Sequence, residues 1–163
     1  MHERVGEFVK ECVKGIDFSG EHVLEIGSKN VNGSVRPLFT GVIYHGIDVL
    51  EGKDVDDIID AKDYDGHEQF DCVVTTDALE HCPEPRTIIE CAYRSLKSGG
   101  MLIVTAASDG RDPHKANGTE GEPIWEWYRN VPPRELSNDL EEVGFVRSEV
   151  RYIDRDVHAI AYK

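Results

Sequence analysis

The chain has 163 residues, which is enough for one globular domain but not for two of ordinary size. Hydrophobic residues make up 39% and charged residues 31%, a balance typical of a folded protein rather than a disordered one. The formal net charge is −14, and no dense basic cluster is present. These charges disfavour nucleic acid as a partner, because proteins gain affinity for it by neutralising phosphates with Lys and Arg.

The sequence also argues against a membrane protein and against a metal protein. No apolar run approaches the length of a membrane span, and the charged residues within 1–20 do not resemble a signal peptide. No CxxC pair is present, so we expect reduced thiols and a cytoplasmic protein. His81 precedes a cysteine, but two adjacent residues lack the ligand spacing of a zinc site. We therefore expect no metal.

The first elements follow from hydrophobic spacing. Apolar residues at helical spacing predict a helix over 3–14. Residues 22–26 predict a short strand that ends at Gly27. We predict a second helix from Ser34, which is a suitable N-cap with Pro37 in the first helical turn.

The middle of the chain alternates between strands and helices. Strands are predicted over 42–48 and 55–60, followed by a connection at 62–69 that is too short and polar for a full helix. Residues 70–75 are predominantly apolar and predict a strand covered on both faces. A helix is predicted over 85–97, ending before the glycine pair in Ser-Gly-Gly.

The last elements close the predicted sheet. A buried strand over 101–106 leads into a long loop at 107–131, and a helix follows over 133–143. Strands at 145–152 and 157–162 are joined by a short connection, which predicts an antiparallel hairpin. Alternating strands and helices imply a mostly parallel sheet. We predict an α/β fold with a doubly wound, mostly parallel seven-stranded sheet, in a single domain spanning residues 1–163.

Two acidic residues mark the ends of neighbouring predicted strands. Glu25 stands in an apolar strand just before Gly27, at the carboxyl end where open α/β sheets bind ligands. Asp48 ends the next strand about twenty residues later, where an acid can accept hydrogen bonds from ribose hydroxyls. A partly exposed Glu beside a glycine turn and an Asp that caps a turn explain the same residues without a ligand. The two acids together favour a ligand more than either alone.

Four sequence stretches, which follow one another in a characteristic order, indicate a specific kind of ligand-binding protein. They are VLEIGSKNVNGSVRPLF, YHGIDVLEGKDVDDIIDA, FDCVVTTDALEHCPEP and RSLKSGGMLIVTA, and they cover roughly residues 20–106. Together they resemble the class I S-adenosylmethionine-dependent methyltransferases, in particular the methyltransferase type 11 domains. The resemblance implies a Rossmann-like methyltransferase fold, S-adenosylmethionine as methyl donor and S-adenosylhomocysteine as product.

The resemblance also implies the cofactor-binding residues. Glu25 and Gly27 correspond to positions that border the methionine part, and Asp48 to the residue that holds the ribose hydroxyls. The remaining implied contacts are Ser28 and Gly33 in the first turn, Val49, Asp60 and Ala61 around the adenine, and Thr76, Asp77 and Leu79 beside or beneath the methionine part. The first glycine after Gly27 is Gly33, so the G-x-G-x-x-G fingerprint is absent. This absence disfavours an NAD-dependent oxidoreductase.

The loop at 107–131 is expected to roof the methyl acceptor. It contains His114, the candidate general base for a hydroxyl or amine acceptor, although an exposed loop histidine would look the same in the sequence. His81 is the second candidate, with packing beneath the cofactor as its alternative role. Trp125 and Trp127 could cover the acceptor, but burial of the loop is the simpler interpretation.

These observations predict a methyltransferase that acts on an oxygen or nitrogen acceptor. No separate substrate domain fits within the chain, so we expect a small-molecule acceptor or a surface feature of a protein, and neither nucleic acid nor a membrane as partner. A non-catalytic S-adenosylmethionine-binding module or partner subunit is the alternative, because no residue is an unambiguous base.

Overall fold

The structure is a computed structural model that describes residues 3–116 and 127–163. Its centre is a seven-stranded sheet in the order β3-β2-β1-β4-β5-β7-β6. Strand β7 runs antiparallel to both of its neighbours, and the other pairs are parallel. This confirms the predicted fold class. The strands are β1 (His22–Ile26), β2 (Ile43–Asp48), β3 (Asp57–Ile58), β4 (Phe70–Thr76), β5 (Leu96–Ala107), β6 (Arg147–Ile153) and β7 (Asp156–Tyr162).

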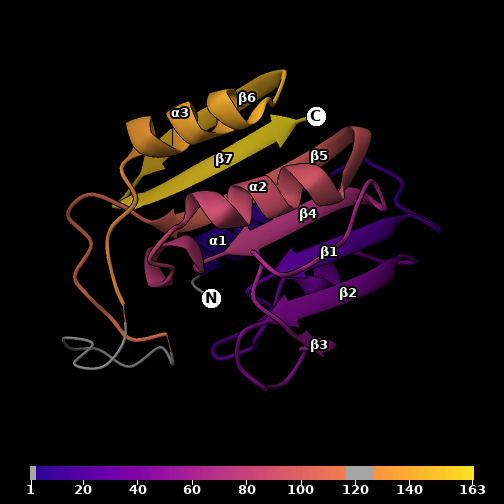
Figure 1. Cartoon of the computed structure of the whole chain (residues 1–163), viewed down its shortest axis with the longest axis horizontal. Helices are drawn as coiled ribbons and strands as arrows, with labels where there is room; N and C mark the ends of the chain where they lie inside the picture. The colour runs from indigo at the N-terminus through magenta and orange to yellow at the C-terminus, as the bar shows by residue number, and fades with distance from the viewer. Residues whose placement is uncertain (1–2, 117–126) are drawn as a thin grey trace.

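Helices cover both faces of the sheet. In Figure 1, α2 (Arg86–Ser95) and α3 (Pro133–Val143) lie in front of the strands, and α1 (Glu3–Val13) lies behind them. Successive residues of a strand point to opposite faces, so Val23 packs in the core beneath α1 while Leu24 packs in the core beneath α2 and α3. Both side chains are fully buried, and burial of each contributes about 1.5–3 kcal/mol. Among the described residues, no helix is long and apolar enough to cross a membrane.

The prediction of a helix that begins at Ser34 is wrong. Only a short 3-10 helix, η1 (Arg36–Leu38), forms there. The guanidinium of Arg36 donates to the carbonyl oxygen of Tyr44 at 3.2 Å and to the carboxylate of Asp56 at 3.0 Å, which ties this connection to β2. Tertiary contacts therefore decide the backbone here, and too few residues remain before β2 for a longer helix.

The helix predicted over 85–97 also ends earlier than expected. It stops at Ser95, because Leu96 already pairs with Phe70 as the first residue of β5. The ladder between β4 and β5 is irregular between Phe70 and Cys72, and Gly99 has φ +81° in this stretch. The Ser-Gly-Gly sequence thus belongs to an irregular strand and not to a helix terminus.

The order of the strands creates a crevice at one edge of the sheet. From β1, the chain adds β2 and β3 on one side, and β4 and β5 on the other. The arrowheads of β1, β2, β4 and β5 point to the same side of the molecule in Figure 1. Open α/β sheets bind ligands at such a reversal of strand order, outside the carboxyl ends of the strands.

Candidate active site

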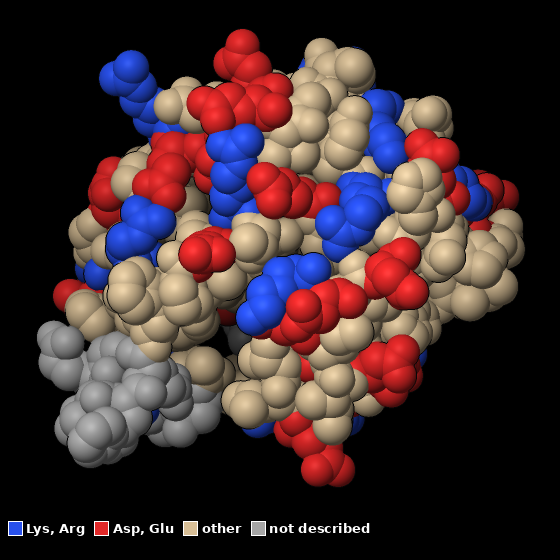
Figure 2. All heavy atoms as spheres, viewed as in Figure 1, with Lys and Arg blue, Asp and Glu red and all other residues tan. Residues whose placement is uncertain are grey.

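A cleft of about 1510 Å³ opens at this edge of the sheet. Figure 2 shows a hollow in the surface on the side to which the strands point. Leu79 does not line the cleft, because it is 1% exposed and packs in the core. The other ten positions predicted for the cofactor do line it: Glu25, Gly27, Ser28, Gly33, Asp48, Val49, Asp60, Ala61, Thr76 and Asp77.

The turn after β1 folds over the end of β2. The backbone N–H groups of Gly27 and Ser28 donate to the carbonyl oxygen of Ile47 at 2.9 and 3.1 Å. The N–H of Lys29 donates to Oδ2 of Asp48 at 3.0 Å. This turn therefore brings Glu25 and Asp48, the two acids predicted from the sequence, to the wall of the same cleft.

Two glycines permit close contacts around this turn. Gly27 has φ +79°, and a Cβ there would lie 2.6 Å from Cβ of Ala78. A Cβ on Gly46 would lie 2.5 Å from the carbonyl oxygen of Asp54 and 2.7 Å from Oγ of Ser28. The need for a glycine at position 46 was not predicted, because it arises from a contact between segments that are distant in the sequence.

Glu25 is an almost completely buried acid in the cleft wall. Its side chain is 3% exposed, and Oε2 accepts a hydrogen bond from the hydroxyl of Tyr44 at 2.8 Å. Burial raises the pKa of Glu25 to about 7, and the hydrogen bond from Tyr44 partly opposes this rise. A cationic ligand group beside Glu25 would favour the ionised carboxylate. The role of Tyr44 was missed, since nothing in the sequence shows which strand residue reaches this acid.

Glu25→Gln is expected to stabilise the ligand-free protein at pH 8. The folded pKa of about 7 lies above the ordinary value of 4.5, so the folded state binds this proton more strongly than the unfolded state. The free energy of unfolding therefore falls as the pH rises from about 4.5 to 7. The variant has no such loss and should be more stable by about 1–3 kcal/mol at pH 8, with little difference at pH 4. Urea unfolding at both pH values measures this.

The exposed Glu7 provides the matched control for that measurement. Glu7→Gln should leave the free energy of unfolding within about 0.5 kcal/mol of the wild type at both pH values. Equal stability of wild type and Glu25→Gln at pH 8 would contradict the raised pKa.

The other end of the cleft is built from residues after β4 and β5. His81 lies in the 3-10 helix η2 (Leu79–His81), and its ring is 5.1 Å from that of His114 and 5.5 Å from that of Tyr128, measured between centroids. Glu80 is 1% exposed, and its Oε1 accepts the N–H of Ala107 at 3.1 Å. Burial raises the pKa of Glu80. Imidazole, phenol and carboxyl groups thus meet beside the cleft.

Of the three residues named for the predicted acceptor loop, the structure describes two. His114 and Trp127 line the cleft. Arg129 pairs with the carboxylate of Glu135 through two N–H groups, at 2.8 and 2.6 Å. Trp125 lies outside the described residues. Arg111 also lines the cleft and pairs with Asp156 at 2.8 Å, a contact that the sequence did not indicate because the two residues are 45 positions apart.

The fold and the cleft together define the class of protein. A doubly wound sheet with a closing antiparallel strand, and two acids at the tips of β1 and β2, is the arrangement expected of class I S-adenosylmethionine-dependent methyltransferases. A family model described as a methyltransferase domain matches residues 1–149. The chain belongs to this family.

A curated relative supports the same assignment. The chain is 27% identical over 164 residues to the ubiquinone biosynthesis O-methyltransferase of Ruegeria sp. (strain TM1040). The match covers 85% of this chain and 66% of the relative, so the chain spans slightly less than two thirds of that protein's length.

Solved structures share the fold. One is the 1,6-didemethyltoxoflavin-N1-methyltransferase of Burkholderia thailandensis, with bound 1,6-didemethyltoxoflavin and S-adenosylhomocysteine. It has a TM-score of 0.71 and 14% identity, over 99% of this chain and 77% of that one. Another is the phosphoethanolamine N-methyltransferase 2 of Haemonchus contortus, in complex with phosphomonomethylethanolamine and S-adenosylhomocysteine. Its TM-score is 0.66 at 19% identity, over 91% of this chain and 38% of that one.

Proposed function

We propose that this chain binds S-adenosylmethionine in the cleft and transfers its methyl group to an oxygen or nitrogen atom of a small molecule. The observation that carries this proposal is the placement of Glu25 and Asp48 on the wall of one cleft, at the tips of neighbouring strands. Membership of the methyltransferase family and structural neighbours that hold S-adenosylhomocysteine support it.

The two acids have complementary tasks in this proposal. Asp48 accepts hydrogen bonds from the ribose hydroxyls, and its carboxylate retains acceptor positions beyond those used by the N–H groups of Lys29 and Leu50. Glu25 faces the ammonium group of the methionine part, which favours the ionised form of this buried acid. Binding at both ends fixes the sulfonium between them, so that the methyl group is presented to the acceptor side of the cleft.

The acceptor lies at the end of the cleft formed by His81 and His114. The sulfonium is already a good leaving group, so catalysis depends mainly on placing the acceptor atom in line with the methyl carbon. A hydroxyl or ammonium acceptor must also lose a proton, and His114 is the candidate group for this step. Acidic and basic side chains are interspersed on the face shown in Figure 2 and form no continuous basic patch there, which favours a small molecule over a nucleic acid.

His114→Ala is expected to reduce turnover while leaving cofactor affinity unchanged. The residue lines the cleft from the segment after β5, whereas Glu25 and Asp48 belong to β1 and β2, and loss of proton transfer lowers rates by about 10²–10⁴-fold. Calorimetric titration with S-adenosylhomocysteine and a methyl-transfer assay separate the two effects. Unchanged turnover would remove His114 from the mechanism.

A labelling experiment tests the proposed function even before the acceptor is identified. The protein is incubated with methyl-labelled S-adenosylmethionine and a fractionated cell extract, and the label is followed by fraction. We expect label in the small-molecule fraction. Label in polymeric nucleic acid would contradict the proposed acceptor class, and cofactor binding without any transfer would indicate a non-catalytic module. A fluorescence response to NADH but not to S-adenosylhomocysteine would favour the oxidoreductase alternative.

A further inference from the structure

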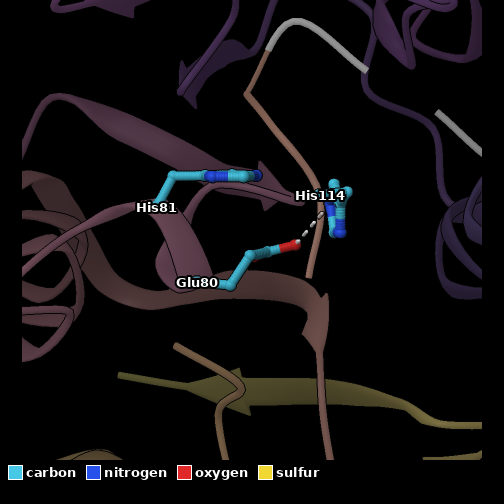
Figure 3. A group of neighbouring side chains, drawn as sticks. All are labelled: Glu80, His81 and His114. Carbon is cyan, nitrogen blue, oxygen red and sulfur yellow. Dashed lines mark ion pairs between the residues drawn. The ribbon is translucent and has the colours of Figure 1, made fainter. Parts of the chain in front are cut away.

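Glu80, His81 and His114 form a compact set of metal-ligand atoms at the acceptor end of the cleft. Glu80 and His81 come from η2, whereas His114 lies in the segment after β5. One ligand atom of each residue lies within 4.8 Å of the other two. Figure 3 shows the side chains of Glu80 and His81 extending in the same direction, towards His114. His81 and His114 also line the cleft, so the cluster is accessible to a ligand there.

The carboxylate of Glu80 is only partly satisfied by the protein. Its Oε1 accepts the N–H of Ala107 and lies 3.9 Å from Nε2 of His114. Its Oε2 has no hydrogen-bond partner among the described residues, although the side chain is 1% exposed. A buried carboxylate oxygen is costly unless a donor or a cation compensates it. This oxygen belongs to the same side chain that faces the two imidazoles.

We propose that Glu80, His81 and His114 bind one divalent transition-metal cation, which in turn binds a hydroxyl oxygen of the methyl acceptor. Two imidazoles and one carboxylate favour Zn²⁺ or Co²⁺ over Mg²⁺ or Ca²⁺, which prefer oxygen ligands. Ligand atoms at about 2.0–2.2 Å from a cation lie about 3–3.5 Å from one another, so small side-chain movements complete the site. Three protein ligands leave at least one position open.

The cation gives a specific reason for an oxygen acceptor. The role of the cation towards the acceptor rests on the proposed function, because that role assumes methyl transfer. The binding of the cation does not depend on the proposed function. A hydroxyl bound to the cation has a lowered pKa and releases its proton to water. The oxygen lone pair then forms the new bond to the methyl carbon, the carbon–sulfur bond breaks, and its electron pair neutralises the sulfonium. His114 then assists the loss of the acceptor's proton by holding the cation, so the lower turnover expected for His114→Ala follows from the loss of this ligand.

The site is tested with the full chain, without a histidine tag, after treatment with a chelator. Co²⁺ is titrated in the absence of S-adenosylmethionine, and the visible absorption of the bound ion is recorded. We expect one Co²⁺ per chain, displaced by added Zn²⁺ but not by an equal concentration of Mg²⁺. Glu80→Gln, His81→Ala and His114→Ala should each lower the affinity by at least about 10- to 100-fold, as even changes in residues that only support metal ligands do.

A matched control variant tests for nonspecific binding of Co²⁺ by histidine, and a stability measurement tests whether the variants fold. His67 is exposed and lies outside the cleft, so His67→Ala should bind Co²⁺ like the wild type. His114 lies in an irregular segment and its side chain is 22% exposed, so His114→Ala is expected to fold. Zn²⁺ should raise the midpoint of thermal unfolding of the wild type and of His67→Ala, but not that of His114→Ala.

The outcomes separate this inference from the proposed function. Absence of Co²⁺ binding by the wild type, or binding that the three substitutions leave unchanged, would overturn the cation site whether or not methyl transfer is detected. Cation binding at the cluster together with methyl transfer that continues after chelation would overturn its role towards the acceptor. Cation binding without transfer to any acceptor counts against the proposed function and leaves the site established.

Discussion

Asp48→Asn is expected to weaken the binding of S-adenosylhomocysteine by about 10- to 100-fold. The carboxylate is placed to accept the ribose hydroxyls, and hydrogen bonds to charged groups contribute about 1.5–3 kcal/mol. The amide that replaces it has a single acceptor oxygen, whereas the carboxylate accepts the N–H of Lys29 through Oδ2 at 3.0 Å and the N–H of Leu50 through Oδ1 at 2.9 Å. One of these two backbone N–H groups therefore loses its acceptor at the same time. Isothermal titration calorimetry measures the change in affinity.

The control for this experiment is another acid near the same edge of the sheet. Asp63 is exposed and does not line the cleft, so Asp63→Asn should bind the ligand like the wild type. Equal losses in the two variants would indicate a general effect of charge. An affinity unchanged in Asp48→Asn would mean that this carboxylate does not hold the ribose.

Gly27→Ala is expected to have the largest effect on both stability and cofactor binding. The residue has φ +79°, which strains any side chain, and the new Cβ would lie 2.6 Å from Cβ of Ala78. Relief of this contact requires movement of the turn after β1, whose residues line the proposed cofactor cleft. We expect a loss of about 2–4 kcal/mol in the free energy of unfolding and no measurable binding of S-adenosylhomocysteine. Urea unfolding and calorimetry provide the two measurements.

Gly20→Ala isolates the contribution of backbone strain. Gly20 has φ +81°, almost the same conformation, but a Cβ there would meet no atom within 4 Å. This substitution should cost only about 1–2 kcal/mol and leave ligand affinity unchanged. If Gly27→Ala were no more harmful than Gly20→Ala, the close approach of the first turn to Ala78 would not be needed for the site.

Elements with strong local signals could be predicted from the sequence. Strand β1 was predicted with its observed bounds, and helix α3 likewise, since its periodic apolar face ends at Gly144, which adopts φ 115°. The prediction failed where tertiary contacts override local preference. The segment after Ser34 forms only η1, and Leu96 leaves the predicted helix because pairing with Phe70 begins there.

The candidate site likewise contains some residues that the sequence predicts and others that only the fold brings together. Glu25 and Asp48 were predicted because each acid stands at the carboxyl end of an apolar strand, and parallel neighbours bring such ends together. The hydrogen bond from Tyr44 to Glu25 was not predicted, because it depends on strand register and side-chain reach. The cluster with Glu80 was missed for a similar reason. As a metal ligand, His81 has only an adjacent cysteine beside it in the sequence, whereas the fold brings His114 close to it.

A crystal structure of the chain with S-adenosylhomocysteine is the most direct test of the proposed cofactor site. We predict the ligand in the cleft at the ends of β1, β2 and β4, with its ribose hydroxyls hydrogen-bonded to Asp48 and its amino group towards Glu25. A ligand bound elsewhere, or one in the cleft that contacts neither carboxylate, would contradict this site.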